Sequence, residues 1–253
     1  YCKNFPKIKS KISKNISSTK KLTLLVTTPI HILKNFKQKL LNRYNCIFIS
    51  ASNLAEIKKI LPVVDYWICN PSPIYKIDSK VLQKADKLKA ILTPSTGVTH
   101  LDNVYLERKK INVISIKKHP MLKNIKASSE FTFGLVFDGL RNLSLGTQSS
   151  KNGYWRQQED HLRGSQLYEK KLGIVGYGRI GSNVAKYAKS FGMKCLANDP
   201  HKKKYLVSKG MYANLDRLIK TSDVILISVH LNASTKNLVN KTFLKKMNKN
   251  AIL

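Results

Sequence analysis

The fold of this chain is decided by Lys171-Leu-Gly-Ile-Val-Gly176-Tyr-Gly178-Arg-Ile-Gly181, where a short apolar run leads into three spaced glycines. The apolar run predicts a buried strand, and the residues after the glycines follow a helical pattern. Gly176 permits a tight turn, Gly178 lets the backbone approach a pyrophosphate, and Gly181 lets the helix pack closely on the strand. The free N–H groups at the start of that helix then face the anion. The stretch therefore predicts a dinucleotide site, with a plain packing turn as the alternative.

An acidic residue supports the dinucleotide interpretation. The next apolar segment, residues 193–198, is followed directly by Asp199, which lies 23 residues after Gly176 (199 − 176). An acid at the end of the second strand can bind both ribose hydroxyls of NAD and repel the 2′-phosphate of NADP. A turn or cap role before Pro200 is the alternative for Asp199. Lysines follow at positions 202–204 and would tolerate an extra phosphate, so NAD is the first choice of cofactor and NADP the second.

Strand-like apolar runs alternate with helical patterns along the rest of the chain, which is typical of an α/β protein with parallel sheets. Strands are predicted at residues 22–28, 46–49, 65–70, 89–92, 113–116, 172–175, 193–198 and 224–229, and residues 251–253 begin another. Helices are predicted at residues 31–43, 53–61, 79–85, 101–110, 128–143, 179–190, 215–220 and 242–247. The long helix at 128–143 has Ser128 and Ser129 as candidate caps and Glu130 in its first turn.

These elements predict two open parallel-sheet domains. A flavodoxin-like domain is expected over residues 1–124, and its Lys- and Ser-rich start at 1–20 is expected to be mobile or part of a truncated element. A Rossmann domain is expected over residues 125–253. That second domain is expected to be incomplete at its C-terminus, because the strand begun at Ala251 stops at Leu253.

Composition narrows the class of protein. The chain has 253 residues, of which 42% are hydrophobic, and it contains no apolar run long enough to cross a membrane. Its start lacks both an initiator Met and an apolar signal sequence, so a cytoplasmic protein whose first residues are missing is expected. The cysteines at 2, 46, 69 and 195 have no paired spacing, which predicts reduced thiols and no metal site.

The charge of the chain is strongly positive. Lys and Arg number 46 against 14 acidic residues, which gives a formal net charge of +32. Most of these cations are lysines spread through both halves, whereas base recognition and bidentate phosphate contacts favour arginine. We therefore expect no dedicated nucleic-acid partner, only a weak and salt-sensitive attraction to polyanions.

Further motifs lie in order along the chain. They are Ser95-Thr96-Gly97-Val98-Thr99-His100-Leu101-Asp102, Gly153-Tyr-Trp155, Arg163-Gly164-Ser-Gln-Leu167, Ser222-Asp223-Val224 and Ser228-Val229-His230-Leu231. With the glycine turn and Asp199, they resemble the D-isomer-specific 2-hydroxyacid dehydrogenases, and most of all the phosphoglycerate dehydrogenase-like members. The resemblance covers about residues 60–253, while the first 60 residues match only in their alternating pattern.

The resemblance implies an NAD-dependent oxidoreductase that transfers a hydride between the nicotinamide and C2 of a 2-hydroxy or 2-keto acid, with a 3-phosphoglycerate-like acid as one candidate. Residues 1–124 would bind the substrate and residues 125–253 would bind NAD. Arg179 and Ile180 match positions that contact the cofactor pyrophosphate, and Leu231 matches a residue that lines the cofactor cleft. The resemblance also implies a homodimer formed through the long helices of the cofactor domain.

Thr96 and Gly97 match the loop whose backbone N–H groups hold the substrate carboxylate in this family. A loop between a strand end and a helix start can present such unpaired donors to an anion. A turn that only caps the following helix is the alternative.

The chain also departs from the family. Asn232 stands where a Pro is usual, and Thr99 and His100 replace a more usual Asp and Asn. The Arg, Glu and His that bind and protonate a 2-keto acid are expected beyond Leu253, so no catalytic residue is assigned and the chain is expected to be inactive alone. His230 matches a cleft-lining His and not the acid/base. The alternative function is a non-catalytic protein that binds NAD(H) or a polyanion.

Overall fold

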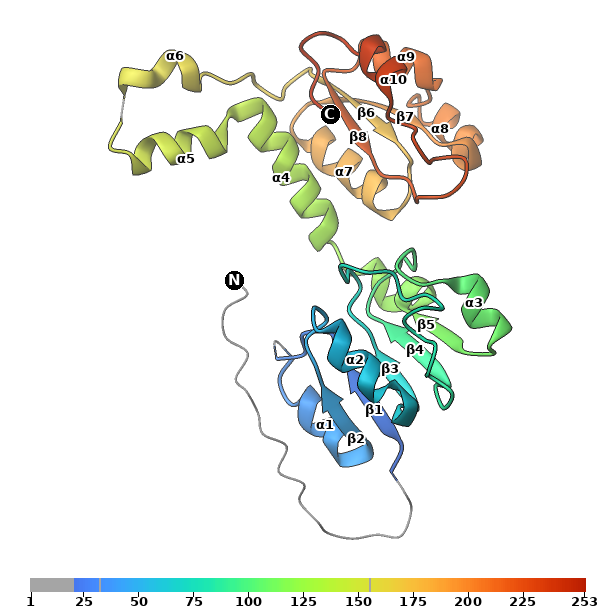
Figure 1. Cartoon of the computed structure of the whole chain (residues 1–253). Coiled ribbons are helices and arrows are strands. Elements are labelled where there is room, and N and C mark those ends of the chain that lie inside the picture. Colours follow the sequence, from blue (N-terminus) through green and yellow to red (C-terminus); the bar gives the residue numbers. More distant parts are fainter. Residues whose placement is uncertain (1–20, 32, 155) are drawn as a thin grey trace. The chain divides into compact units, whose positions relative to one another are not determined.

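The structure, a computed structural model, describes residues 21–31, 33–154 and 156–253. The start at 1–20, predicted to be mobile, and Trp155 of the Gly153 motif lie outside the described residues. The chain divides into two compact units, Tyr1–Lys117 (unit 1) and Lys118–Leu253 (unit 2), and each is an α/β body in Figure 1. Among the described residues, no helix has the length and apolar character that a membrane span requires.

Unit 1 is built on a five-stranded parallel sheet. Its strands are β1 (Thr23–Val26), β2 (Asn45–Phe48), β3 (Tyr66–Ile68), β4 (Ala90–Thr93) and β5 (Asn112–Ser115). They lie in the order β2-β1-β3-β4-β5, and every neighbouring pair runs parallel. This order, 2-1-3-4-5, is that of flavodoxin-like sheets, so the fold predicted for the first domain is confirmed. Ligands bind sheets of this kind beyond the carboxyl ends of the strands.

The helices of unit 1 are short. They are α1 (Phe36–Arg43), α2 (Leu54–Ile60) and α3 (Asn103–Arg108), with 3₁₀ turns η1 (Leu61–Val63) and η2 (Ile116–Lys118). The side chains of Asn53 and Asp102 begin α2 and α3 by accepting hydrogen bonds from the N–H groups of Glu56 and Tyr105. One core cluster joins both helices to the sheet through the fully buried residues Ile57, Trp67, Ile91 and Leu106.

The predicted helix at residues 79–85 is wrong. The Asp78 carboxylate accepts hydrogen bonds from the N–H groups of Lys80 (3.0 Å) and Val81 (3.2 Å), which fixes a side-chain turn where the helix would begin. The segment continues as turns, with the Ala85 N–H donating to the Leu82 carbonyl. Val81, Leu82 and Ala85 are nevertheless buried in the core. The helical spacing of these apolar residues therefore reflects the packing of successive turns.

Unit 2 is built on a three-stranded parallel sheet of β6 (Lys171–Val175), β7 (Lys194–Asn198) and β8 (Val224–Ile227). β6 lies between β7 and β8. Single-residue bridges extend the sheet on both sides, because Tyr212 pairs with Ala197 and Ile252 pairs with Val224. With these bridges the order across the sheet is 3-2-1-4-5, as in the Rossmann fold. The fold predicted for the second domain is confirmed. Where a strand was predicted at 251–253, the structure has a single-residue bridge at Ile252.

The longest helix of unit 2 does not begin with the cap residues that were predicted for it. The helices of this unit are α4 (Ala127–Arg141), α5 (Leu143–Lys151), α6 (Glu159–Leu162), α7 (Arg179–Ser190), α8 (Lys203–Ser208), α9 (Leu215–Thr221) and α10 (Lys241–Lys246), with 3₁₀ turns η3 (Pro120–Lys123), η4 (Arg156–Gln158) and η5 (Pro200–Lys202). Glu130 lies in the first turn of α4, as predicted, but Ser128 and Ser129 do not cap it. Both serines lie inside the helix, and the buried Ser129 hydroxyl accepts a hydrogen bond from the Asn183 side chain of α7 (3.5 Å).

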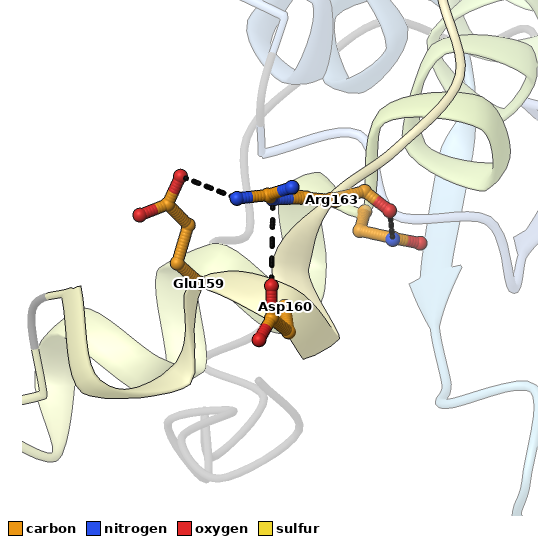
Figure 2. Close-up of polar contacts among 4 residues, drawn as sticks. Glu159, Asp160 and Arg163 are labelled. Carbon is orange, nitrogen blue, oxygen red and sulfur yellow. Dashed lines mark hydrogen bonds and ion pairs between the residues drawn. The ribbon is translucent and has the colours of Figure 1, made fainter.

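The helix predicted over 128–143 is divided because Asn142 adopts the left-handed conformation (φ 53°) between α4 and α5. Figure 1 shows α5 and α6 projecting away from the sheet of unit 2. We call residues 143–163 the arm. Figure 2 shows how its end is held: the Arg163 guanidinium lies 3.3 Å from a Glu159 oxygen and 3.6 Å from an Asp160 oxygen, and the Arg163 carbonyl accepts a hydrogen bond from the Asn142 side chain (3.2 Å).

Each sheet carries a carboxylate at the amino end of its first strand. In unit 1, Asp65 precedes β3 and accepts a hydrogen bond from the Thr23 N–H of β1 (2.9 Å), with the Lys89 ammonium 3.4 Å away. In unit 2, Asp223 precedes β8 and accepts a hydrogen bond from the Lys171 N–H of β6 (2.7 Å). The Thr23 N–H, helped by Lys89, lowers the pKa of the Asp65 carboxyl below its usual range. We call Asp65 and Asp223 the amino-end carboxylates, and each fixes the register of two neighbouring strands.

Asp65→Asn is expected to lower the free energy of unfolding by about 1–2 kcal/mol at pH 7, because a charge-assisted hydrogen bond is weakened. The pKa of Asp65 is lower in the folded chain than in the unfolded chain, so its contribution is present at neutral pH. The contribution is lost as the pH falls below about 4 and through the folded pKa. Urea unfolding at pH 7 and pH 3 measures this loss, with the exposed Asp86→Asn as the control. A difference that does not shrink in acid would contradict the charged role of Asp65.

Candidate cofactor and substrate sites

The glycine turn joins β6 to α7 at the place where the strand order of unit 2 reverses, between β6 and β8. Gly176 has a φ of 93°, in the region that favours glycine. Its N–H donates to the Asn198 carbonyl at the end of β7 (2.8 Å), and its carbonyl accepts a hydrogen bond from the Ser228 hydroxyl just after β8 (2.6 Å). The turn is therefore held from both neighbouring strands at their carboxyl ends.

The glycines of the turn meet different surroundings. A Cβ on Gly176 would lie 2.7 Å from the Ser228 carbonyl oxygen, and a Cβ on Gly181 would overlap the Gly176 carbonyl oxygen. A Cβ on Gly178, by contrast, would meet no protein atom within 4 Å. Packing inside the protein thus requires Gly176 and Gly181, whereas Gly178 faces open space.

Unpaired backbone donors lie at the start of α7. No side chain caps this helix, and in the described part of the chain the N–H groups of Gly178, Arg179 and Ile180 have no acceptor. Donors of this kind at a helix N-terminus, together with the helix dipole, bind anions. One guanidinium nitrogen of Arg179 donates to the Ile125 carbonyl (2.6 Å). The arrangement fits a pyrophosphate held mainly by the backbone.

The Asp199 carboxylate points toward the glycine turn. Oδ2 accepts a hydrogen bond from the Tyr177 N–H (2.9 Å), and Oδ1 accepts one from the His201 N–H (3.0 Å). The second bond makes Asp199 the cap of η5, so the alternative role predicted for it is present. Each carboxylate oxygen keeps a lone pair beyond these bonds, which leaves acceptors for ribose hydroxyls. The structure thus brings Asp199 to the glycine turn.

Lys202 also contacts this turn. Its Nζ donates to the Tyr177 carbonyl (2.8 Å) and lies 5.9 Å from the centre of the Tyr177 ring. Asp199 and Lys202 therefore bind the N–H and the carbonyl of one residue in the turn. The lysines at 202–204 were predicted to tolerate an extra phosphate, but nothing in the sequence singles out Lys202. The η5 turn decides which of these lysines points back to the glycine turn.

Leu231 lies beyond the carboxyl end of β8, at the same edge of the sheet as the glycine turn, and its side chain is 66% exposed. The loop around it is shaped by Asn232, whose Oδ1 accepts hydrogen bonds from the N–H groups of Ser234 (2.9 Å) and Thr235 (3.1 Å). The Thr235 hydroxyl donates to the carbonyl of His230, whose side chain is exposed. Asn232, which the resemblance places where a Pro is usual, thus makes a side-chain turn of its own.

In unit 1, Thr96 and Gly97 lie in the loop after β4, at the carboxyl edge of the sheet. Within residues 21–117 apart from residue 32, neither of their N–H groups has an acceptor. The Ser95 hydroxyl donates to the Gly97 carbonyl (2.7 Å), and the Ser95 carbonyl accepts a hydrogen bond from the Ile116 N–H (3.2 Å). The role of capping the next helix belongs to Asp102. This loop therefore offers two unpaired donors to an anion.

The side chains that commonly bind metal ions do not cluster in the part of the chain that the structure describes. Across the described ranges, no three side chains of His, Cys, Asp or Glu gather into a group that could hold a metal ion. The chemistry that these two edges offer is therefore hydrogen bonding by N–H donors and by the Asp199 carboxylate. Anions in both units and a diol beside Asp199 are the ligands that such groups bind.

Two family models match the chain. The catalytic domain of the D-isomer-specific 2-hydroxyacid dehydrogenases matches residues 24–123, and the NAD-binding domain of the same family matches residues 133–253. The two matched regions follow one another in the order of the two units. They contain the Thr96 loop and the glycine turn respectively.

Individual relatives are similar over most of this chain but are longer. The chain is 32% identical over 198 residues to the hydroxypyruvate reductase of Thermotoga maritima, a match that covers 78% of the chain and 62% of the relative. It is 34% identical over 181 residues to the D-3-phosphoglycerate dehydrogenase of Methanocaldococcus jannaschii, with 70% of the chain and 33% of the relative covered. The chain thus spans less than two thirds of the length of either relative.

Solved structures have the same fold. A D-lactate dehydrogenase from Aquifex aeolicus, complexed with NAD and lactic acid, matches with a TM-score of 0.71 and 29% identity, covering 89% of this chain and 66% of that one. An NAD-dependent formate dehydrogenase from Staphylococcus aureus, in complex with NAD, matches with a TM-score of 0.78 and 25% identity, covering 91% and 72%.

Proposed function

This chain belongs to the family of D-isomer-specific 2-hydroxyacid dehydrogenases, and from that premise we propose that unit 2 binds NAD and unit 1 binds a 2-hydroxy or 2-keto acid. NAD is the cofactor of the family's second domain. The proposed reaction is the transfer of a hydride between the nicotinamide and C2 of the acid. The chain would supply the residues that bind and orient both molecules.

The cofactor part of this proposal rests on the structure of the glycine turn. Open space in front of Gly178 and unpaired N–H groups at Gly178, Arg179 and Ile180 occur together at the switch point of a Rossmann sheet. The residues present therefore fit a pyrophosphate. Asp199, held against Tyr177, would accept hydrogen bonds from the adenosine ribose.

The substrate part of the proposal rests on the loop after β4. The N–H groups of Thr96 and Gly97 would hold the carboxylate of the acid, because they are unpaired and face no protein acceptor. Bound NAD supplies the chemistry of hydride transfer. Removing a hydride from a hydroxy acid also requires that its hydroxyl proton be taken up. We propose that the Arg, Glu and His that serve this step in the family follow Leu253 in the whole protein, so that this chain alone binds without turnover.

The acid itself is proposed at the level of a class. A 3-phosphoglycerate-like acid is one candidate, supported by the similarity to a phosphoglycerate dehydrogenase. Hydroxypyruvate and glyoxylate are the others, since relatives carry those names. All three candidates share a carboxylate, which is the group that the Thr96 loop would bind.

The proposed function is tested by fluorescence titration of the chain with NADH, followed by assays of a longer chain that continues past Leu253. We expect NADH to bind the 253-residue chain, and we expect the longer chain to oxidise NADH when a panel of 2-keto acids is supplied. Binding without turnover in the longer chain would favour a non-catalytic NAD(H)-binding protein. Absence of NADH binding would contradict the proposal.

Asp199→Arg is expected to raise the affinity for NADPH relative to NADH by at least about tenfold, because the carboxylate that repels a 2′-phosphate becomes a cation. Asp199 also supports Tyr177, so Asp199→Asn is the matched variant that keeps an acceptor for the Tyr177 N–H and loses the charge. It should shift the preference in the same direction by less. Titrations with both cofactors measure the ratio, and an unchanged ratio would remove Asp199 from the ribose.

We also propose that the protein is a homodimer formed through α4 and the arm. Large apolar side chains are exposed along α4 and the arm. They are 46–72% exposed and comprise Phe131, Leu135, Leu143, Leu145 and Tyr154. The arm projects away from the sheet of unit 2 and does not pack on it (Figure 1). Several large apolar side chains exposed on neighbouring segments of the chain support an interface, because such side chains gain from being covered by a partner.

Leu145→Asp should convert a dimer into a monomer, because it places a charge among the apolar residues of the arm. Light scattering should then give the 28.7 kDa of one chain instead of twice that mass. Val104→Asp is the control, because Val104 is 80% exposed on α3 of unit 1. A wild-type mass of one chain, or dissociation by both variants alike, would contradict the proposed interface.

The free cysteines support a cytoplasmic location, which we propose on that basis. Cys46, Cys69 and Cys195 are all free thiols in the structure. Proteins of reducing compartments keep such thiols unpaired.

A further inference from the structure

Two side chains hold the peptide group between Gly176 and Tyr177. Its carbonyl accepts a hydrogen bond from the Ser228 hydroxyl (2.6 Å), and its N–H donates to the Asp199 carboxylate (2.9 Å). Ser228 follows β8 and Asp199 follows β7, so the contacts come from the strands on both sides of β6. Both polar groups of this peptide are therefore bound within the protein.

The next peptide group, between Tyr177 and Gly178, is held at one end only. Its carbonyl accepts a hydrogen bond from the Lys202 ammonium (2.8 Å). Its N–H, which belongs to Gly178, has no acceptor in the described part of the chain. The carbonyl and the N–H of a trans peptide point in opposite directions because the group is planar. The side chain that binds the Tyr177 carbonyl therefore also determines where the Gly178 N–H points.

The η5 turn brings Lys202 to this carbonyl. Asp199 begins η5 by accepting a hydrogen bond from a backbone N–H of the turn (3.0 Å), and Lys202 ends it. The neighbouring lysine has a different contact, because the Lys203 ammonium lies 5.3 Å from the centre of the Tyr212 ring. One short turn thus supplies both the acid that binds the Tyr177 N–H and the cation that binds the Tyr177 carbonyl.

An ammonium on this carbonyl also strengthens the N–H at the other end of the peptide. Hydrogen bonds from charged donors are stronger than those between neutral groups, and hydrogen bonds that share a peptide polarise one another. The Gly178 N–H is the first of the unpaired donors at the start of α7, where an anion is favoured. The contact from Lys202 therefore fixes the direction of this donor and makes it a stronger one.

We propose that Lys202 is a positioning residue for the cofactor pyrophosphate, because it binds the Tyr177 carbonyl and so holds the Gly178 N–H toward the anion. This rests on the proposed function of unit 2. The alternative, which the run of lysines suggests, is that Lys202 binds the 2′-phosphate of NADP directly. The two roles differ in their ligands: a positioning residue supports every ligand that contains the pyrophosphate, whereas a phosphate contact supports NADPH alone.

Lys202→Met should weaken the binding of NADH and of NADPH by the same factor, roughly tenfold, because both cofactors contain the pyrophosphate. Lys202→Arg should retain most of the affinity, since a guanidinium also donates to a carbonyl. Lys203→Met removes the same charge from the next position and is the matched control, with a loss of NADH affinity of less than about twofold. Fluorescence titrations at physiological ionic strength measure these affinities. A larger loss for NADPH than for NADH would overturn the proposal.

Two smaller ligands separate an effect on the pyrophosphate from an effect on the η5 turn. ADP contains the pyrophosphate, whereas adenosine has only the base and the ribose that Asp199 would bind. In ¹H–¹⁵N NMR titrations of the 253-residue chain, Lys202→Met should weaken ADP binding and leave adenosine binding unchanged. ADP should also shift the Gly178 amide proton of the wild type downfield, and the variant should lose most of this shift. Equal weakening of both ligands would mean that Lys202 only shapes η5, which would overturn the proposal.

The wild-type chain separates this proposal from the proposed function of unit 2. If it binds NADH and Lys202→Met binds NADH equally well, unit 2 keeps its proposed function and Lys202 loses its positioning role. If the wild type binds neither NADH nor ADP, the proposed function and the role of Lys202 both fail.

Discussion

Gly178→Val is expected to abolish NADH binding, with an affinity loss of more than about 100-fold, while the chain stays folded. A Cβ at this position would meet no protein atom within 4 Å, and the backbone of Gly178 is extended (φ −77°), so the protein itself tolerates a side chain there. The added methyl groups would occupy the space that the pyrophosphate needs in front of the α7 N–H groups. Fluorescence titration with NADH measures the loss.

Thermal unfolding of the same variant supplies the control for Gly178→Val. We expect a melting temperature within about 2 °C of the wild type, because a surface substitution with open space around it has little effect on stability. An unchanged affinity for NADH would mean that the space in front of Gly178 is not used by the cofactor. A large drop in melting temperature would instead assign Gly178 a role in packing.

Gly181→Ala should have the opposite outcome, and destabilise unit 2 by about 3 kcal/mol or more. A Cβ on Gly181 would overlap the Gly176 carbonyl oxygen and would lie 2.9 Å from a methyl group of Ile174. Ile174 lies in β6 and Gly176 follows that strand directly, so α7 would have to move away from the sheet. Loss of cofactor binding would follow from this displacement.

Urea unfolding monitored by circular dichroism measures the effect of Gly181→Ala. Gly134→Ala is the matched control, because Gly134 also lies inside a helix of unit 2 and a Cβ there would meet nothing within 4 Å. It should leave stability unchanged or raise it by up to about 1 kcal/mol, since alanine favours helices. Equal stability of the two alanine variants would contradict the close packing of α7 on β6.

The glycine turn is a part of the fold that could be predicted from the sequence. The roles of Gly176, Gly178 and Gly181 follow from the spacing of the turn, because one short segment contains the strand, the turn and the start of the helix. The parallel direction of the strands was predictable for a similar reason, since strands that alternate with helices favour parallel sheets. The absence of a helix at residues 79–85 was not predictable. The side-chain turn at Asp78 competes with a helix there but leaves the spacing of the apolar residues unchanged.

The contacts of the site were less predictable than its location. The glycine turn is contacted by Lys202 and Ser228 from positions distant in sequence, and only the folded chain brings them close. Ser129 has the residue type of a helix cap but is buried against Asn183, because α4 begins earlier than expected. Short-range patterns thus identify the residues that shape the backbone, and long-range packing decides which side chains support them.

The amino-end carboxylates Asp65 and Asp223 lie at the opposite edge of each sheet from the loops proposed to bind ligands. Strand alignment is therefore specified at one end, while the recognition that we propose takes place at the other. Loops such as 94–100 and 228–237 can then be exchanged or lengthened without realigning the strands beneath them. This separation makes both units suitable scaffolds for grafting new specificities, in which only one rim has to be redesigned.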